Sequence, residues 1–420
     1  MAANPESESP SACDRLMEEV CERENLKQAL KRVKANKGAP GVDGMTVQAL
    51  PAFLREHWPS IRATLLSGTY KPQPVRRVEL PKPDGGGVRK LGIPSVLDRF
   101  VQQAVLQVLQ RQWDPTFSDS SYGFRPGRSA HQAVAQAQSY IQAGYRWVVD
   151  LDLEKFFDRV SHDILMSRVA KRVSDRRVLK LIRSFLTAGV MENGLVGATD
   201  EGAPQGGPLS PLLSNLMLDD FDRELERRGL RFVRYADDSN VYVRSERAGQ
   251  RVMATGKLKL KVNEAKSAVA RPHTRKFLGF TFSNRVEVKR RVAPKALARF
   301  KDRIRELTQR TRGVSVEQLI GTLKRYLTGW RGYFGFCETP SVLRKLDEWV
   351  RRRLRCFLWK QWKRGRTRFQ ELSARGVNRN LAAQTAGSPQ GAWRLSCSPA
   401  LSIALSNRYF RSLGLPSVGS

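Results

Sequence analysis

The sequence has few of the residues that form disulfide frameworks or zinc sites. Five cysteines and four histidines occur among 420 residues. The cysteines form no CxxC pair, and the histidines are scattered singly along the chain. An odd number of cysteines without paired spacing is typical of a protein in a reducing compartment. We therefore expect a cytoplasmic protein without structural zinc.

Long apolar runs are also missing. The longest uncharged stretches are residues 129–145, which are rich in glutamine, and 202–218, which prolines interrupt at three positions. Neither can form the continuous apolar helix of about 20 residues that spans a bilayer. The first 20 residues are acidic and lack the basic-then-apolar order of a secretion signal. We therefore expect no membrane partner.

Acidic residues are scarce relative to basic ones. Forty Asp and Glu oppose 74 Lys and Arg, which leaves a net charge of +34. Residues 281–420 contain 30 basic and 8 acidic residues, whereas residues 1–280 contain 44 basic and 32 acidic ones. Such a chain attracts polyanions, most commonly nucleic acid, with acidic substrates and membrane lipid as weaker alternatives. The C-terminal third is therefore expected to bind RNA or DNA.

Helical and strand patterns are mixed along the chain. The spacing of apolar residues predicts amphipathic helices at 14–35, 295–311, 315–331 and 341–364. Alternating patterns beside turn residues predict two hairpins and one strand, at 75–93, 231–243 and 147–153. The order of these elements favours an α+β fold over repeated βαβ units.

Carboxylates gather at two points of the predicted strands. Asp237 and Asp238 lie at the turn of the second hairpin, and Asp150 and Asp152 share one face of the single strand. An ordinary aspartate-containing β-turn is one interpretation. However, adjacent carboxylates repel each other unless a cation neutralises them. Together the two groups supply oxygen ligands for two Mg²⁺ ions about 4 Å apart, the arrangement that catalyses in-line displacement at phosphorus.

Five further motifs occur in a fixed order along the chain. They are KANKGAPGVDG at 34–44, SYGFRPGR at 121–128, DLEKFFD at 152–158, PQGGPLSP at 204–211 and YADD at 235–238. Their order and surroundings resemble a reverse transcriptase of the group II intron type. The likeness continues through residues 277–280, 326–333 and 346–355, and covers roughly residues 25–415.

The resemblance implies a right-hand polymerase. It implies fingers and a palm with an antiparallel sheet, then an α-helical thumb or maturase domain, and then a small basic DNA-binding segment. The expected boundaries are 1–45 for an N-terminal helix and template-contacting loop, 46–285 for fingers and palm, 286–365 for the thumb, and 366–420 for the DNA-binding segment.

The resemblance also assigns roles to single residues. The catalytic, metal-binding aspartates fall on Asp152, Asp237 and Asp238, with the Leu153 carbonyl as a further ligand and Asp150 outside the ligand set. The cofactor implied is two Mg²⁺ ions, for which Mn²⁺ can substitute. Alternatives stay open for the nucleotide contacts, since Phe156 can pack in a core and the lysines and arginine can be solvated surface charges. These nucleotide contacts are Lys82, Arg89, Phe156, Gln205 and Lys266.

Further residues are expected to contact nucleic acid. In the helix at 341–364 the apolar side chains form one stripe, and the cations outside it can reach phosphates while Trp349 and Trp359 stack on bases. The alternative for these cations is a solubilising basic face. The expected nucleic-acid contacts are Lys37, Arg125, Gly206, Arg344, Arg351, Arg352, Arg355 and Lys363.

The function implied by the resemblance is RNA-directed DNA synthesis by a bacterial protein that also helps its intron RNA to splice. Its partners would be group II intron RNA, an RNA template, a DNA primer or target, and dNTPs. No protein partner is required, and a homodimer is compatible with the sequence. The alternatives are a splicing maturase with vestigial polymerase activity, another bacterial reverse transcriptase, and an RNA-templated RNA polymerase. No nuclease is expected, because the sequence to Ser420 has no paired CxxC motifs.

Overall fold

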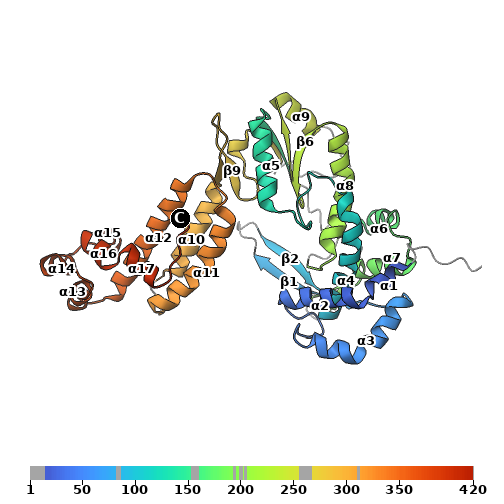
Figure 1. The fold of residues 1–420 in the computed structure, drawn as a ribbon, viewed down its shortest axis with the longest axis horizontal. Coiled ribbons are helices and arrows are strands. Elements are labelled where there is room, and N and C mark those ends of the chain that lie inside the picture. The colour runs from blue at the N-terminus through green and yellow to red at the C-terminus, as the bar shows by residue number, and fades with distance from the viewer. Residues whose placement is uncertain are drawn as a thin grey trace, which may run out of the picture. The chain divides into compact units, whose positions relative to one another are not determined.

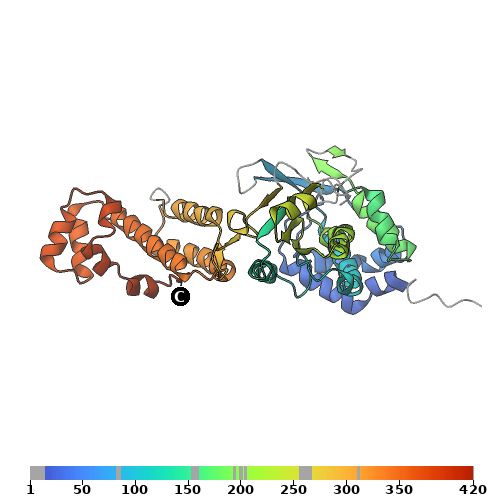
Figure 2. The same cartoon turned by 90° about the horizontal axis from the view of Figure 1, so that it is seen from above.

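The computed structural model divides the chain into two units. The first contains residues 1–133 and 145–270, and the second contains residues 134–144 and 271–420 (Figures 1 and 2). Among the described residues, no helix is long and apolar enough to cross a membrane. The structure describes residues 15–81, 87–152, 160–192, 195–197, 202, 206–254, 267–309 and 313–419, except the side chains of Arg89 and Asp152.

Helices are the main elements of the first unit, and all of them except α9 contribute to a shared apolar core. Side chains cap several of them. The Ser95 hydroxyl accepts a hydrogen bond from the Asp98 amide at 3.0 Å, which satisfies a free N–H group in the first turn of α4. The helices of this unit are α1 (Leu16–Val20), α2 (Arg23–Ala35), α3 (Leu50–Leu66), α4 (Val96–Trp113), α6 (His162–Ala170), α7 (Arg176–Leu186), α8 (Ser210–Arg227) and α9 (Glu246–Ala254).

The prediction of a single helix at 14–35 is wrong, because the helix is interrupted between α1 and α2. Glu22 has an extended backbone, with φ −65° and ψ 138°. The Asn25 side chain donates hydrogen bonds from Nδ2 to the Val20 carbonyl at 2.9 Å and to the Ala104 carbonyl at 3.1 Å. This buried amide stabilises the break and also holds α2 against α4.

Asp175 caps α7 and connects it to α1. Its carboxylate accepts hydrogen bonds from the Arg177 amide at 2.9 Å, the Arg177 guanidinium at 2.9 Å and the Met17 amide at 3.0 Å. Burial alone raises the pKa of Asp175, but these hydrogen bonds outweigh burial and hold the pKa below its usual value. The ionised carboxylate therefore favours the folded state.

Asp175→Asn is expected to lower the free energy of unfolding at neutral pH by about 1–3 kcal/mol, because a charged, buried acceptor is lost. A lowered pKa confers stability that is present above the unfolded-state value of about 4 and disappears as the pH falls through the folded-state value. The difference between variant and wild type should therefore shrink on acidification, as urea unfolding across the pH range measures. An undiminished difference in acid would contradict this account.

Asp163→Asn serves as the control for this comparison. Asp163 lies in the first turn of α6, and its side chain is 82% exposed. Exposed ion pairs contribute little to stability. This variant should change the free energy of unfolding by less than about 0.5 kcal/mol.

The first sheet contains the hairpin that the sequence predicts at 75–93. Strands β1 (Val75–Pro81) and β2 (Val88–Ile93) pair in antiparallel fashion and place Leu80 opposite Arg89. Strand β1 also pairs in parallel with β4 (Val190–Glu192), and β4 pairs with β5 (Leu195–Gly197). The resulting strand order is β2-β1-β4-β5.

The second sheet positions the carboxylates. Its strand order is β6-β7-β3-β8, and every neighbouring pair is antiparallel, which confirms the antiparallel palm sheet implied by the resemblance. Apolar residues of the sheet pack with Phe221 and Leu225 of α8 and with Val252 of α9. The strands are β3 (Trp147–Asp152), β6 (Arg231–Tyr235), β7 (Asp238–Val243) and β8 (Ala268–Ala270).

The second unit begins earlier in the sequence than the thumb boundary predicted at 285/286. The C-terminal half of α5 (Ala130–Gln142) belongs to it, since Gln138 donates to the Val288 carbonyl at 2.6 Å and to Glu338 at 2.7 Å. The helices predicted at 295–311, 315–331 and 341–364 are present with slightly different ends. The further elements are β9 (Phe280–Phe282), β10 (Arg290–Val292), α10 (Pro294–Leu307), α11 (Val316–Phe334) and α12 (Pro340–Gln361).

Short helices after residue 364 complete the second unit and share its core. Leu372, Leu401 and Phe410 are fully buried in the same apolar cluster as Phe300 and Leu354. Asp347 of α12 accepts hydrogen bonds from the Val418 and Gly419 amides, both at 2.9 Å. These helices are α13 (Gly365–Ala374), α14 (Arg379–Ala386), α15 (Ala392–Leu395), α16 (Pro399–Ala404) and α17 (Asn407–Ser412).

Candidate active site

The turn between β6 and β7 carries two adjacent aspartates. Tyr235 pairs with Asp238 across the hairpin, which leaves Ala236 and Asp237 as a two-residue turn. Asp237 is half-buried and Asp238 is exposed. Ala236 has a φ of +58°, in the left-handed region that costs an L-residue about 1–2 kcal/mol. Contacts from the surrounding structure must therefore hold this turn.

Strand β3 brings a third aspartate to the same end of the sheet. In the pairing of β3 with β7, Asp152 lies directly opposite Asp238. Residues directly opposite in antiparallel strands have Cα atoms about 4.5–5.5 Å apart. These two aspartates are some 85 residues apart in the sequence, yet the strand pairing brings their segments together. The backbone register places the two segments that carry the predicted carboxylates at the same end of the sheet, and Asp150 lies two residues further along, opposite Asn240.

The donor set of this site consists of oxygen atoms. Among the residues whose side chains are described, no three His, Cys, Asp or Glu side chains form a metal-binding group. The group expected here requires the Asp152 side chain and the Leu153 carbonyl, both outside the described part of the chain. Aspartates at opposite positions of neighbouring strands offer oxygen ligands, which suit a hard divalent cation rather than zinc.

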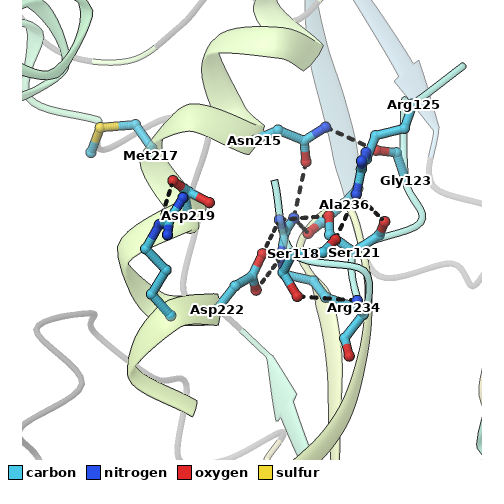
Figure 3. A network of polar contacts seen from close by, with 12 residues as sticks. Ser118, Ser121, Gly123, Arg125, Asn215, Met217, Asp219, Asp222, Arg234 and Ala236 are labelled. Atoms are coloured by element: carbon cyan, nitrogen blue, oxygen red, sulfur yellow. Dashed lines mark hydrogen bonds and ion pairs between the residues drawn. The ribbon is translucent and has the colours of Figure 1, made fainter. Parts of the chain in front are cut away.

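A buried arginine lies directly behind the turn (Figure 3). Arg234 of β6 and Asp222 of α8 form a two-bond ion pair, with Nε–Oδ1 at 2.7 Å and Nη2–Oδ2 at 2.6 Å. Both side chains have 0% exposure. Burial raises the pKa of the Asp222 carboxyl, and the Arg234 guanidinium limits that rise. Removing one partner from such a buried pair typically costs about 3–5 kcal/mol.

The other donors of Arg234 reach the turn and two neighbouring elements. Nη1 donates to the Ala236 carbonyl at 2.9 Å and to Asn215 Oδ1 at 3.0 Å, and Nη2 donates to Ser121 Oγ at 2.8 Å. The Asn215 amide donates in turn to the Gly123 carbonyl at 2.9 Å. All five N–H groups of the guanidinium therefore have acceptors, one of them in the aspartate turn itself.

The segment around Gly123 lies against the turn so closely that only glycine fits. A Cβ atom at position 123 would lie 2.2 Å from the Ala236 nitrogen and 2.9 Å from the Tyr235 carbonyl carbon. Both are backbone atoms, so neither can move as the end of a flexible side chain could. The position of this segment and the position of the aspartate turn are thus mechanically coupled.

Gly123→Ala is expected to displace the aspartate turn and to reduce any cation-dependent catalysis at this site at least about tenfold, which corresponds to about 1.4 kcal/mol. Overpacking of this kind should also lower the free energy of unfolding by about 1–3 kcal/mol. Gly321→Ala in α11 is the control, because a Cβ there has no atom within 4 Å. Steady-state rates and urea unfolding of both variants measure the effects, and a fully active Gly123→Ala protein would show that the turn tolerates the displacement.

Arg125 was expected to contact nucleic acid, but its environment gives no support to that prediction. The side chain is 4% exposed and pairs with Asp114 at 2.9 Å. Its guanidinium also donates to the Ser118 carbonyl at 2.6 Å and the Ser121 carbonyl at 3.0 Å. These contacts give Arg125 a structural role in the segment that packs on the aspartate turn (Figure 3).

The nucleotide contacts expected from the resemblance lie mostly outside the described residues. This is true of Lys82, Phe156, Gln205, Lys266 and the side chain of Arg89. They therefore stay predictions. Gly206 is described, and a Cβ there would lie 2.6 Å from the Gly92 carbonyl oxygen. Its close approach to β2 accounts for a glycine at 206, whereas its contact with nucleic acid stays a prediction.

The apolar stripe expected on α12 is confirmed, but its cations fall into two groups. Arg344 and Lys363 are exposed. Arg352 stacks on Trp393, with 3.9 Å from Cζ to the ring centroid, and Arg355 donates to the Leu405 carbonyl at 3.0 Å. Burial lowers the pKa of Arg355. The latter two arginines therefore pack α12 against the helices that follow it.

Other expected nucleic-acid contacts differ in exposure. Lys37 is exposed and has a left-handed backbone with φ +47°, and Arg351 is half-buried. Trp349 is half-buried, whereas Trp359 is 1% exposed and lies beneath Arg368. The expectation that Trp359 stacks on bases is wrong, because the ring is part of the apolar core.

Sequence reasoning missed the residues that support the turn, above all Arg234 and Asp222. A signal was present in both segments. Arg234 interrupts an apolar strand, and Asp222 follows Phe221 on the buried face of α8. Opposite charges at two core-facing positions indicate a buried pair, since an isolated buried charge is costly.

Comparisons with known proteins match two parts of the chain. Residues 80–282 match the family described as reverse transcriptase (RNA-dependent DNA polymerase), and residues 297–376 match the family described as group II intron, maturase-specific domain. Among solved structures, the partial Cas6-RT-Cas1–Cas2 complex is 27% identical over 55% of this chain and 38% of that chain, with a TM-score of 0.38.

Two curated relatives illustrate the sequence similarity. Protein YkfC of Escherichia coli K12 is 42% identical over 222 residues, which cover 51% of this chain and 58% of the relative. Group II intron-encoded protein LtrA of Lactococcus lactis subsp. cremoris is 37% identical over 206 residues, which cover 49% of this chain and 34% of the relative. The matches thus span between a third and three fifths of these relatives. The chain thus carries a reverse transcriptase domain followed by a group II intron maturase-specific domain.

Proposed function

We propose that this protein is an RNA-directed DNA polymerase that also binds a group II intron RNA and assists its splicing and mobility. The observation that carries the polymerase part is the strand register that places Asp152 opposite Asp238, beside the turn that holds Asp237. The matched maturase-specific domain supports the RNA-binding part. Substrates and partners of the proposal are an RNA template, a DNA primer or target, dNTPs and intron RNA.

Reverse transcriptases generally use divalent metal ions, and we propose Mg²⁺ here, with two ions held by Asp152, Asp237 and Asp238. When bound, such ions supply charge stabilisation for the attacking and leaving oxygens of an in-line displacement. The carboxylates would hold the cations at the end of the second sheet, and the Leu153 carbonyl would add a ligand. Lys82 and Arg89 would orient the triphosphate from the β1–β2 hairpin, and Gln205 and Lys266 would contact the nucleotide.

The sugar of the incoming nucleotide would be selected by Phe156. An aromatic ring beside the ribose leaves no room for a 2′-hydroxyl group, so dNTPs would enter and NTPs would be rejected. The basic excess of the second unit would supply phosphate contacts, which give sequence-independent and salt-dependent affinity for RNA. Polymerization and RNA binding therefore depend on different residues of the chain.

Primer extension on an RNA template tests the proposal. The full chain should extend a DNA primer with dNTPs in the presence of Mg²⁺, should stop when the cation is chelated, and should discriminate against NTPs. Binding of intron RNA is measured in parallel by filter retention. Binding without extension on any template would favour the alternative, a splicing maturase with vestigial polymerase activity.

A further inference from the structure

On the basis of the proposed polymerase function, we propose that Arg234 is a positioning residue for the aspartate turn. Asp222 fixes the guanidinium of Arg234, and this guanidinium holds the Ala236 carbonyl and thereby sets where Asp237 and Asp238 present their carboxylates. Arg234 itself need not touch the cation or the nucleotide.

The first support is the geometry of the donors. Arg234 uses three N–H groups on Asp222 and Ser121 and the remaining two on Asn215 and the Ala236 carbonyl. Nη1 and the Ala236 carbonyl oxygen are 2.9 Å apart. Because a guanidinium is planar and rigid, acceptors on one side of it fix the position of the acceptor on the other side.

The second support is the conformation of the turn. Ala236 is 7% exposed and has a φ of +58°, which an alanine keeps only when its surroundings enforce it. The Arg234 bond to its carbonyl provides one constraint, and Gly123 against its nitrogen provides another. Asp237 and Asp238 follow directly, so the direction of their side chains depends on this constrained residue.

The third support is that β6 is also held through the main chain of Arg234. Its amide donates to the Ser120 carbonyl at 2.9 Å, and its carbonyl accepts from the Tyr122 amide at 2.8 Å. Residue 234 is therefore anchored at the backbone and at the end of its side chain. Arg234 therefore connects both the segment around Ser121 and the helix α8 to the aspartate turn (Figure 3).

Stability alone is a poor reason for this ion pair. Replacing a buried ion pair with apolar residues of similar size is often neutral or stabilising, whereas removing one partner leaves an unpaired buried charge. An apolar pair at positions 222 and 234 would fill the same space but could not hold the Ala236 carbonyl. This difference separates a positioning role from a purely structural one.

The deciding variant is therefore the double substitution Arg234→Met with Asp222→Leu. The matched control is Arg172→Met with Asp219→Leu, which removes another ion pair of α8 whose Nη2–Oδ2 distance is 2.7 Å. Neither Arg172 nor Asp219 contacts the aspartate turn by any described hydrogen bond. Both double variants should unfold cooperatively and retain the affinity of the full chain for intron RNA.

Three readouts separate the two roles. In the Arg234→Met, Asp222→Leu protein (the turn variant), peptides covering residues 231–243 should exchange amide hydrogens at least about tenfold faster. Its dissociation constant for Mn²⁺, measured by electron paramagnetic resonance, should rise at least about tenfold. Primer extension should lose kcat with an unchanged KM for the primer–template. The control should match wild type in all three. Wild-type exchange and wild-type Mn²⁺ affinity in the folded turn variant would overturn the proposal.

If the double variant does not fold, Arg234→Lys decides the question. A lysine keeps the positive charge beside Asp222, but its compact ammonium cannot reproduce the planar fork that reaches Ala236 as well. Exchange and Mn²⁺ affinity should change in the same direction as above, and unchanged values would overturn the proposal. Absence of primer extension by wild type refutes the polymerase function alone, because the exchange measurement still decides the role of Arg234.

Discussion

Asp237→Asn is expected to reduce DNA synthesis on an RNA template at least about 10³-fold, which corresponds to about 4 kcal/mol of transition-state stabilisation. Asparagine keeps the shape of the side chain but removes the negative charge that balances a divalent cation. Asp237 lies in the turn itself, and Asp238 beside it pairs with Asp152 across the strands, so the remaining carboxylates cannot take its place. Single-turnover primer extension over a range of Mg²⁺ concentrations measures the loss.

Two comparisons make this expectation specific. Asp150→Asn changes a carboxylate on the same strand as Asp152, opposite Asn240 rather than Asp238, and should leave synthesis within about twofold of wild type. Intron RNA binding by Asp237→Asn should be nearly unchanged, because affinity comes from phosphate contacts. Substantial primer extension by Asp237→Asn would refute the assignment of the site.

Replacing three exposed cations in and just after α12 is expected to have the second-largest effect. The triple variant Arg344→Ala, Lys345→Ala and Lys363→Ala should weaken intron RNA binding roughly 100-fold at low salt, if each phosphate contact contributes about 1 kcal/mol. All three side chains are exposed. The dependence of log K on log salt concentration should become shallower by about 2, since each lost contact with a single strand removes about 0.7. Equilibrium binding at several salt concentrations measures both quantities.

Arg355→Ala is the matched control on the same helix. Its guanidinium is committed to the Leu405 carbonyl, so its loss should lower thermal stability and leave the salt dependence of RNA binding unchanged. A variant that binds RNA like wild type after loss of Arg344, Lys345 and Lys363 would show that these three cations do not bind RNA. Primer extension on a short template should survive in the triple variant.

The carboxylate site was predictable because its residues lie in local sequence patterns that can be recognised. Two adjacent aspartates in a short turn between apolar strands can be recognised in one sequence without an alignment. The register of the hairpin follows from that turn. The strand ending at Asp152 was equally visible. Its pairing with β7 was not derivable from the residues alone, since no local pattern specifies which strands become neighbours, and the family resemblance supplied it.

Sequence reasoning reaches its limit where tertiary contacts decide whether a charge or a ring is buried. Arg125 lies in a polar loop, where the Asp114 carboxylate, three backbone carbonyls and the Phe117 ring remove it from solvent. Trp359 lies outside the single apolar stripe of α12, yet later helices cover that side as well. The pair formed by Arg234 and Asp222 joins different elements, so neither residue reveals its partner by spacing.

The shared core of α10–α17 limits how this protein can be recombined with its relatives. A chimera joined at 365/366, the boundary predicted from sequence, would cut between Leu354 and the side chains of Leu372 and Phe410 that pack in the same cluster. A graft that begins at residue 271 would still leave behind the half of α5 that contacts Glu338. The transplantable module is therefore discontinuous, and a functional exchange must carry residues 134–144 together with everything from 271 onward.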